Sequence, residues 1–422
     1  MATASAFLEL LKNCPQTSCG EPVGGGAEAG VCPHCGAVYQ ICPACGATNR
    51  QHVEYCRACR ERLNAEAWPS YPGLRAGARA RSPIKGMGKQ FTHVRLNTAV
   101  VAAPIALGEL ILVPAHEGGI VLIDETEGKP FGRVTTGGPI EVTPAINAGF
   151  LFVAAGDQLS AFDLLEGIGQ KTPEEMRPMW AVQSSGGAIS CPLLVSDTAV
   201  FFVASAGGRS TLDARSQVDG RPVWQKPLSF DAELLPATLL DDCLVLLTVD
   251  GRATVLDPSD GRLLVTMSLG LKVDASVTPF AVGDHVLFAD QAGRIFRLSV
   301  KGETLAAPHI YDLNARVSCI TANDRYIVLG HSAGVTLLDE RGDRLWEDTS
   351  GEGVSLAPVL AGDSFLTLDD VGNAALYRAS RQGTPEDRRK LLTGDVATPP
   401  IMTRTKIAAV SSEGMLGLAQ CL

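Results

Sequence analysis

Eight of the twelve cysteines lie within the first 59 residues, where they form four closely spaced pairs. The pairs are Cys14 and Cys19, Cys32 and Cys35, Cys42 and Cys45, and Cys56 and Cys59. Two cysteines separated by two residues can turn both sulfur atoms toward one metal ion, and two such pairs complete a tetrahedral site. Four thiolates leave no open coordination position, so this pattern predicts structural rather than catalytic zinc.

The distances between the pairs indicate which of them share an ion. Loops of 12 and 10 residues separate the first pair from the second and the third from the fourth, whereas 6 residues separate the second from the third. Since a zinc ribbon closes over a loop of roughly ten to twenty residues, we predict two zinc sites of four cysteines each. One site comprises Cys14, Cys19, Cys32 and Cys35, and the other comprises Cys42, Cys45, Cys56 and Cys59.

The four cysteine segments read NCPQTSCG, VCPHCG, ICPACG and YCRACR, and together they resemble the double zinc ribbon family. The four-residue spacing inside the first pair departs from the usual two. Disulfides are the alternative, which a cytosolic location would disfavour. A module this short buries little apolar surface, so zinc would supply its folding free energy, about 10–16 kcal/mol per site.

A segment rich in proline, glycine and arginine, residues 64–88, predicts an extended linker. It divides a zinc ribbon module, residues 1–63, from a second domain, residues 89–422. Residues 1–89 carry ten Lys or Arg against six Glu, a formal +4 in a chain whose total is −10. Each four-thiolate zinc site would carry a charge of about −2, so two sites would offset the formal +4 of residues 1–89. The basic stripe from Arg75 to Lys89 therefore supports nucleic-acid binding only weakly. It could equally be a solubilising tether or dock onto an acidic surface.

The chain repeats itself from residue 98 onward. Each unit opens with a small or apolar residue before proline, and continues with an apolar run, a turn and further short strands. The openings are Ala103-Pro104, Thr143-Pro144, Cys191-Pro192, Leu235-Pro236, Thr278-Pro279, Ala357-Pro358 and Thr398-Pro399, with Ser318-Cys319 at the position that lacks proline. The repeat predicts an all-β fold, an eight-bladed β-propeller, with seven blades as the alternative. Residues 89–97 are expected to supply the missing outer strand of the last blade and so close the ring.

The best preserved units include LVLLTVDGRATVLDPSDGRLL and YIVLGHSAGVTLLDERGDRLW. They resemble the PQQ-like repeats of quinoprotein-type propellers, in which a Leu-Asp turn and a glycine precede an outer-strand tryptophan. We expect the aspartate to cap the turn and the tryptophan to pack between neighbouring blades. The matching aspartates are Asp124, Asp163, Asp213, Asp257 and Asp339, and the tryptophans are Trp180, Trp224 and Trp346.

The propeller segment offers little catalytic chemistry. It lacks the adjacent Cys-Cys pair that quinoprotein dehydrogenases place over their quinone, and Cys191 and Cys319 are expected to be buried core thiols. The sequence GHSAG (330–334) matches the G-x-S-x-G motif of α/β-hydrolases, but a strand-like segment follows it and no histidine lies downstream. We therefore predict an inter-strand turn there, no catalytic residue and no enzymatic activity.

The N-terminal MATASAFLELLKN has neither the basic region nor the long apolar run of a secretory signal, so a cytoplasmic protein without a membrane partner is expected. Zinc ribbons and propellers are both common interaction surfaces. We therefore predict a non-catalytic scaffold or adaptor in a cytosolic multi-protein assembly, with the two parts engaging separate protein partners. Its resemblance to accessory components of bacterial assemblies implies a MoxR-type AAA+ ATPase and von Willebrand A proteins as partners. The alternative is a nucleic-acid-binding accessory protein that uses the zinc ribbons and the basic linker.

Overall fold

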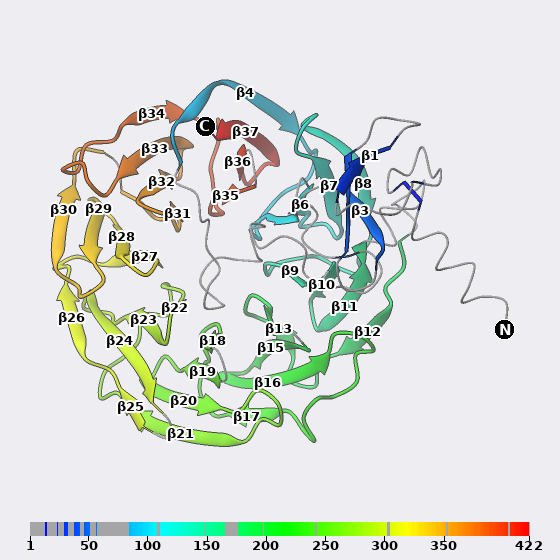
Figure 1. Ribbon diagram of the computed structural model, residues 1–422. Coiled ribbons are helices and arrows are strands. Elements are labelled where there is room, and N and C mark those ends of the chain that lie inside the picture. Colours follow the sequence, from blue (N-terminus) through cyan, green and yellow to red (C-terminus); the bar gives the residue numbers. More distant parts are fainter. Residues whose placement is uncertain are drawn as a thin grey trace.

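The computed structural model describes the chain from residue 84 to residue 421 with short gaps, and a few short N-terminal segments. The described residues are 13–14, 23, 29–32, 38–42, 46–50, 56, 84–107, 110–147, 149–164, 176–196, 198–240, 243–301, 304–351, 353–403 and 406–421. Eight antiparallel sheets stand like blades around a common axis (Figure 1). The prediction of an eight-bladed propeller is confirmed, and the seven-bladed alternative is wrong.

The first four blades follow one another along the chain, each running from the centre of the ring outward. Blade 1 contains β5 (Ile105–Leu107), β6 (Leu110–Pro114), β7 (Ile120–Asp124) and β8 (Lys129–Val134), and blade 2 contains β9 (Ala145–Asn147), β10 (Phe150–Ala155), β11 (Gln158–Asp163) and β12 (Trp180–Gln183). Blade 3 contains β13 (Ala188–Ile189), β14 (Leu194–Val195), β15 (Ala199–Ala206), β16 (Arg209–Ser216) and β17 (Leu228–Phe230). Blade 4 contains β18 (Thr238–Leu240), β19 (Cys243–Leu247), β20 (Arg252–Leu256) and β21 (Leu263–Ser268).

The other four blades continue the ring. Blade 5 contains β22 (Phe280–Val282), β23 (His285–Ala289), β24 (Arg294–Lys301), β25 (Thr304–Ala306) and β26 (His309–Asp312), and blade 6 contains β27 (Val317–Ala322), β28 (Tyr326–His331), β29 (Gly334–Asp339) and β30 (Arg344–Asp348). Blade 7 contains β31 (Val359–Ala361), β32 (Ser364–Leu368), β33 (Asn373–Arg378) and β34 (Asp387–Lys390). Blade 8 contains β35 (Ile401–Met402), β36 (Lys406–Val410), β37 (Met415–Cys421) and β4 (Met87–Arg95).

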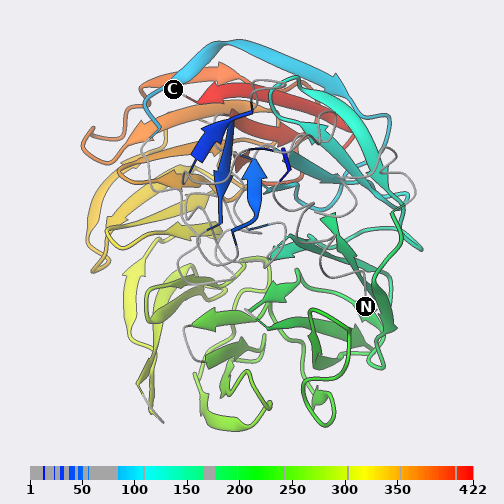
Figure 2. The same cartoon turned by 45° about the vertical axis from the view of Figure 1, so that its right-hand side comes forward.

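Strand β4 joins the two ends of the ring. It pairs antiparallel with β37 over a register that includes Thr92 opposite Leu418, and Figures 1 and 2 show it on the rim outside β37. The closing strand was expected at residues 89–97, and it begins two residues earlier, at Met87. Ile84, just ahead of it, is completely buried among side chains of blades 7 and 8. Closure leaves the last blade with an outer strand like every other blade.

The core lies between neighbouring blades, as the apolar runs of the repeat require. The second strand of each blade is covered on both faces, so it appears in the sequence as a continuous apolar run. In one such layer, Phe152 of blade 2 packs with Phe202 of blade 3. Proline precedes the innermost strand in most blades, where its missing N–H leaves no gap in the hydrogen-bonded ladder.

The three tryptophans link consecutive blades, as predicted. Trp180 and Trp346 lie on outer strands, whereas Trp224 lies in the bend before β17 and not on the predicted outer strand. The Trp224 indole N–H donates to the Pro258 carbonyl of blade 4 at 3.0 Å. Its ring lies over Gly261, where an added Cβ would be 2.8 Å from Trp224 Cδ2. Trp180 covers Gly220 and donates to the Gln217 carbonyl, and Trp346 lies beside Gly383 and donates to the Ala379 carbonyl. Each tryptophan therefore uses its apolar body and its single donor on the same neighbouring turn.

The predicted capping role of the Leu-Asp aspartates holds in three blades and fails in one. Asp257 Oδ1 accepts the N–H of Ser259 at 2.9 Å, and Asp124 and Asp339 accept equivalent turn N–H groups. Asp213 is different, because it lies inside β16 and pairs with Arg215 at 2.7 Å. The turn after Asp163 lies outside the described residues. The prediction for Asp213 is therefore wrong.

Candidate functional site

The predicted zinc cysteines are only partly within the described residues. Cys14, Cys32, Cys42 and Cys56 are described and buried, whereas Cys19, Cys35, Cys45 and Cys59 lie outside the described residues. Cys14 and Cys32 share a cluster with Val23 and Tyr39, and Cys42 and Cys56 share one with Ala47. Each cluster thus contains one cysteine from each pair of a predicted site. Within the described residues alone, no group of three or more potential metal ligands is complete.

A small sheet arranges these cysteines. Strands β1 (Ala29–Val31), β2 (Val38–Ile41) and β3 (Thr48–Arg50) are antiparallel neighbours, and Cys32 and Cys42 directly follow β1 and β2. Gly46 has φ +74° and donates its N–H to the Cys42 carbonyl at 2.9 Å, and the Cys42 N–H donates to the Ala47 carbonyl at 2.9 Å. The Asn49 amide nitrogen lies 3.5 Å from Cys56 Sγ. An N–H donated to sulfur stabilises a thiolate and orients it, as outer groups do around metal sites.

The propeller thiols are core residues, as predicted. Cys191 and Cys319 are buried, and their sulfurs face the Leu234 carbonyl at 3.7 Å and the Leu356 carbonyl at 3.3 Å, each on the next blade. Burial raises the pKa of Cys191 to about 11 and that of Cys319 to about 12. Both groups therefore remain neutral thiols at physiological pH.

The GHSAG segment forms the predicted turn between β28 and β29. His331 is buried in this turn; its Nδ1 accepts the Ala333 N–H at 3.3 Å, and its Nε2 lies 3.1 Å from the Thr336 hydroxyl. Burial lowers the pKa of His331, although Glu347 at 3.7 Å opposes the shift. Its ring nitrogens hold the turn in shape, which accounts for a histidine at this position.

The turns between second and third strands share a feature that the repeat pattern did not predict. In five blades a polar residue stands three positions before a glycine of positive φ, and its side chain accepts N–H groups of the turn. In blade 7, Asp369 Oδ1 accepts the N–H of Val371 at 3.2 Å and that of Asn373 at 2.7 Å. The equivalent residues are Thr248, Asp290, His331 and Ser411, followed by Gly251, Gly293, Gly334 and Gly414. A polar-x-x-Gly pattern after each apolar run would have located these turns.

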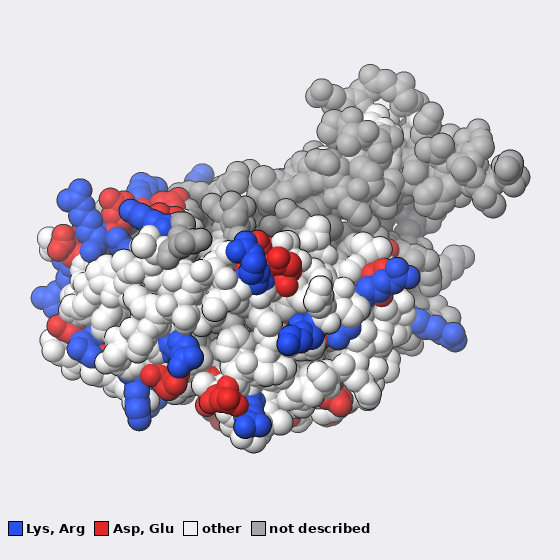
Figure 3. Space-filling view, turned by 90° about the horizontal axis from the view of Figure 1, so that it is seen from below, with Lys and Arg blue, Asp and Glu red and all other residues white. Residues whose placement is uncertain are grey.

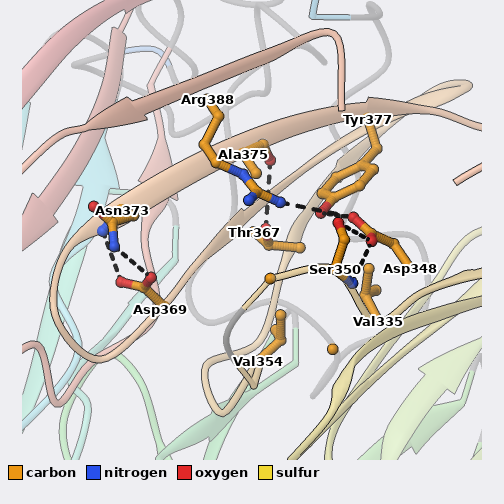
Figure 4. Close-up of a pocket in the computed structure, with 12 residues that line it drawn as sticks. Val335, Asp348, Ser350, Val354, Thr367, Asp369, Asn373, Ala375, Tyr377 and Arg388 are labelled. Carbon is orange, nitrogen blue, oxygen red and sulfur yellow. Dashed lines mark hydrogen bonds and ion pairs between the residues drawn. The ribbon is translucent and has the colours of Figure 1, made fainter. Parts of the chain in front are cut away.

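We call the propeller face that carries these turns (115–119, 248–251, 290–293, 331–334, 369–372 and 411–414) the turn face. The connections between blades emerge on the same face, because each blade has four antiparallel strand positions; in blade 3 β13 and β14 share one position, and in blade 5 β25 and β26 share one. A cavity of about 370 Å³ opens there between blades 6 and 7 (Figure 4). Its lining combines apolar side chains with converging polar groups, the usual composition of a ligand pocket. The lining includes Val335, Asp348, Ser350, Gly351, Val354, Ala375, Tyr377 and Arg388.

Asp348 organises the polar wall of this cavity. Its Oδ1 accepts the Ser350 N–H at 2.8 Å and the Ser350 hydroxyl at 2.6 Å, and its Oδ2 accepts the Tyr377 hydroxyl at 2.9 Å. Burial would raise the pKa of Asp348, but the bonds from Ser350 and Tyr377 and the Arg388 charge outweigh it and lower the pKa. Burial and the bond to Asp348 raise the pKa of Tyr377 to about 12. An ionised carboxylate and a neutral phenol therefore face each other at neutral pH.

Charged side chains of both signs are interspersed over the part of the propeller seen in Figure 3. Most of that surface carries neither Lys or Arg nor Asp or Glu. Such a distribution differs from the contiguous basic stripe expected of a nucleic-acid-binding face. The residues that the structure describes form no helix with the length and apolar character that a membrane span requires.

The fold and its repeat define the class of eight-bladed β-propellers with PQQ-like repeats. The family model described as outer membrane protein assembly factor BamB matches residues 172–382, and the chain belongs to this family. A relative from Burkholderia pseudomallei, named outer membrane protein assembly factor BamB, is 24% identical over 321 residues, which cover 69% of this chain and 77% of the relative.

Solved structures agree on the fold. BamB from Moraxella catarrhalis matches with a TM-score of 0.61 at 17% identity, covering 79% of this chain and 100% of that one. Quinohemoprotein alcohol dehydrogenase from Comamonas testosteroni matches with a TM-score of 0.61 at 12% identity, covering 85% of this chain and 81% of that one. An assembly factor and a dehydrogenase thus share this architecture, so the fold alone assigns no activity.

The comparisons correct one prediction from the sequence. The cytoplasmic location expected from the N-terminal residues is contradicted, because the family and the Burkholderia relative are both named for assembly of the outer membrane. The absence of a recognisable secretory segment in MATASAFLELLKN was the basis of that expectation. It is a weaker indicator than the match of a family model to half of the chain.

Proposed function

We propose that this protein is a non-catalytic scaffold that brings protein partners together, with the propeller and the N-terminal cysteine module engaging separate partners. The observation that carries the proposal is membership of a family described as outer membrane protein assembly factor BamB. Belonging to an assembly-factor family favours a role in protein–protein contacts over one in turnover of a substrate.

The closed ring supports a particular mode of binding. Strand β4 completes the last blade, so the ring joins its own ends and each blade has an outer strand. A partner would then meet the side chains and backbone of turns and inter-blade connections. The turn face combines rigid, internally hydrogen-bonded turns with a cavity, which suits it to recognise a partner without rearrangement.

For the N-terminal module we propose two structural zinc ions, one per set of four cysteines. The clustering of Cys14 with Cys32 and of Cys42 with Cys56 supports this partition, because it follows the pairing inferred from loop lengths. The ions would fold the module and keep its surface in one conformation for a partner. No zinc-dependent reaction is part of the proposal.

The test is affinity purification of the intact protein from its own host, using nuclease-treated and detergent-solubilised lysate, with identification of co-purifying proteins by mass spectrometry. A variant lacking residues 1–63 is purified in parallel. Stoichiometric partners, some of which depend on residues 1–63, are the expected result. Recovery of nucleic acid without protein partners, when nuclease is omitted, would favour the nucleic-acid alternative. A MoxR-type AAA+ ATPase with von Willebrand A proteins stays a prediction that the same experiment tests.

A further inference from the structure

The cavity between blades 6 and 7 contains an arginine whose charge is only partly matched. Arg388 Nη2 lies 3.7 Å from Asp348 Oδ2, and this is its one ion pair among the described residues. That carboxylate already accepts three shorter hydrogen bonds, from Ser350 and Tyr377. Arg388 also interacts with the Tyr377 hydroxyl. Beyond these two contacts, the other N–H donors of the guanidinium remain available to a further acceptor.

The neighbouring arginines make the contrast clear, since each is close to its own carboxylate. Arg378 Nε and Arg381 Nε lie 2.7 and 3.0 Å from the Glu386 carboxylate. Arg389 Nε is 2.8 Å from Asp387. Arg344 Nη1 is 3.2 Å from Glu347. Lys390 stands two residues beyond Arg388 on the same side of β34, is exposed, and has no ion pair in the described part of the chain. Two cations thus point toward the cavity side of blade 7.

The remaining lining fits an apolar group beside an anion. Val335, Val354 and Ala375 form the apolar wall, and the side chain of Arg388 is 44% exposed at the mouth. Gly351 lies directly under the guanidinium, and an added Cβ there would be 3.1 Å from Arg388 Nη2. The guanidinium therefore already occupies the space over Gly351, and a partner segment would reach Arg388 from its exposed side at the mouth.

We propose that this cavity binds an acidic side chain of an extended partner segment, with the carboxylate on Arg388 and an adjacent apolar side chain against Val335 and Val354. A carboxylate can take two parallel hydrogen bonds from a guanidinium, which fixes its orientation as well as its charge. The proposal rests on the scaffold function above and assigns one of its binding sites on the turn face. The acids of the cavity do not compete, because Asp348 and Asp369 are engaged by internal donors.

The test is ligand-observed saturation-transfer NMR on the full chain with three probes: acetyl-Gly-Glu-Leu-Gly-amide, the same peptide with Gln in place of Glu, and free glutarate. We expect the Glu peptide to bind roughly tenfold more tightly than the Gln peptide, because a charge-assisted hydrogen bond is lost. Arg388→Gln should remove that preference. Arg344→Gln, the same substitution on an exposed blade 6 arginine outside the cavity, should retain it.

A second variant guards against a folding defect in Arg388→Gln. Gly351→Leu keeps the arginine but sets a side chain against its guanidinium, since an added Cβ already lies 3.1 Å from Arg388 Nη2, and this glycine lies outside the left-handed region. It should also abolish binding of the Glu peptide. Absence of binding, equal binding of both peptides, or unchanged binding to Arg388→Gln would each overturn the proposal. Tighter binding of glutarate than of the peptide would overturn the peptide assignment in favour of a free small carboxylate. If the peptide fails while partners still co-purify, this inference falls and the scaffold function stands.

Discussion

Cys191 and Cys319 occupy the same place in two repeats, on the inner side of a blade and next to a carbonyl of the following blade. Burial raises the pKa of both thiols to about 11 and about 12, far above neutral pH. Since only the thiolate reacts readily, we expect iodoacetamide at pH 8 to leave both residues unmodified in the folded protein. Peptide mapping by mass spectrometry, with a urea-unfolded sample as control, measures this. Rapid alkylation of Cys319 in the native state would show that the blade interface opens.

Tyr377 contributes stability through its bond to Asp348. Tyr377→Phe removes a donor from a buried carboxylate, so we expect it to destabilise the fold by about 1.5–3 kcal/mol at pH 7. The pKa of Asp348 is lowered in the folded state, so its stabilising contribution is present above its unfolded value of 3.8 and is lost as the pH falls through the folded value. The difference between wild type and Tyr377→Phe should therefore shrink on acidification below pH 3.8.

Urea unfolding at pH 7 and at a series of lower pH values measures this difference. Tyr326→Phe is the matched control, because the Tyr326 side chain is only half-buried and its hydroxyl makes no hydrogen bond within the described residues. A loss for Tyr377→Phe as small as that of the control would show that the bond to Asp348 contributes nothing.

At the scale of the element, the contact between Trp224 and Gly261 can be separated into its parts. Gly261 has φ +74°, and an added Cβ would lie 2.8 Å from the indole ring. Gly270 has a similar φ of +67° but nothing within 4 Å of its added Cβ. Gly270→Ala should therefore lower the free energy of unfolding only by the cost of a left-handed backbone at alanine, about 1–2 kcal/mol. Gly261→Ala should lower the free energy of unfolding by at least about 1 kcal/mol more than Gly270→Ala does, because the Trp224 indole ring must move. Equal losses in urea unfolding would mean that the tryptophan adjusts freely.

The register of the turns shows what local sequence can and cannot predict. The apolar runs and the prolines together predicted the number of blades. Each apolar run marks a strand that is covered on both faces, and each proline marks the beginning of an innermost strand. The Leu-Asp pair misplaced one turn, since the Gly220 N–H bonds the Ser216 carbonyl just as the Gly261 N–H bonds the Asp257 carbonyl. Ser216, not Asp213, is therefore the equivalent residue. Counting back from the glycine locates the turn better than the Leu-Asp pair does, because the positive φ at that position strongly favours glycine.

The cavity could not be predicted in this way. Its polar wall joins Asp348 at the end of β30 to Tyr377 on β33 and Arg388 on β34, so it comes from two different blades. None of the three residues belongs to the repeat pattern. Their convergence depends on how two blades pack side by side, which no pattern within a single repeat records. The zinc pairing, by contrast, could be predicted from sequence because its constraint, loop length between knuckles, is local, and it stays a prediction.

For the whole molecule, the cysteine module and the propeller should respond separately to loss of metal. Among the described residues, the clusters around Cys14 and Cys42 share no member with the clusters of the blades. We expect native mass spectrometry to find two zinc ions per chain, and EDTA to make residues 1–63 sensitive to protease while the main thermal transition changes little. A chain without zinc would contradict the metal proposal. A large shift of the main transition on chelation would contradict the independence of the two parts.

The closure of the ring depends on residues 84–95, and two truncations separate these from the residues before them. A chain that begins at Ser82 keeps β4 and leaves Ile84 N as an amide, which donates to the Ser364 hydroxyl at 2.7 Å, so it should melt within a few degrees of the full chain. A chain that begins at Asn97 loses both, exposes the edge of β37 and empties the space filled by Ile84 and Met87. We expect it to melt at a much lower temperature and to aggregate, because an open sheet edge offers a template for pairing. Circular dichroism melts with light scattering measure both effects, and equal stability of the two truncations would refute the role of β4 in holding the ring.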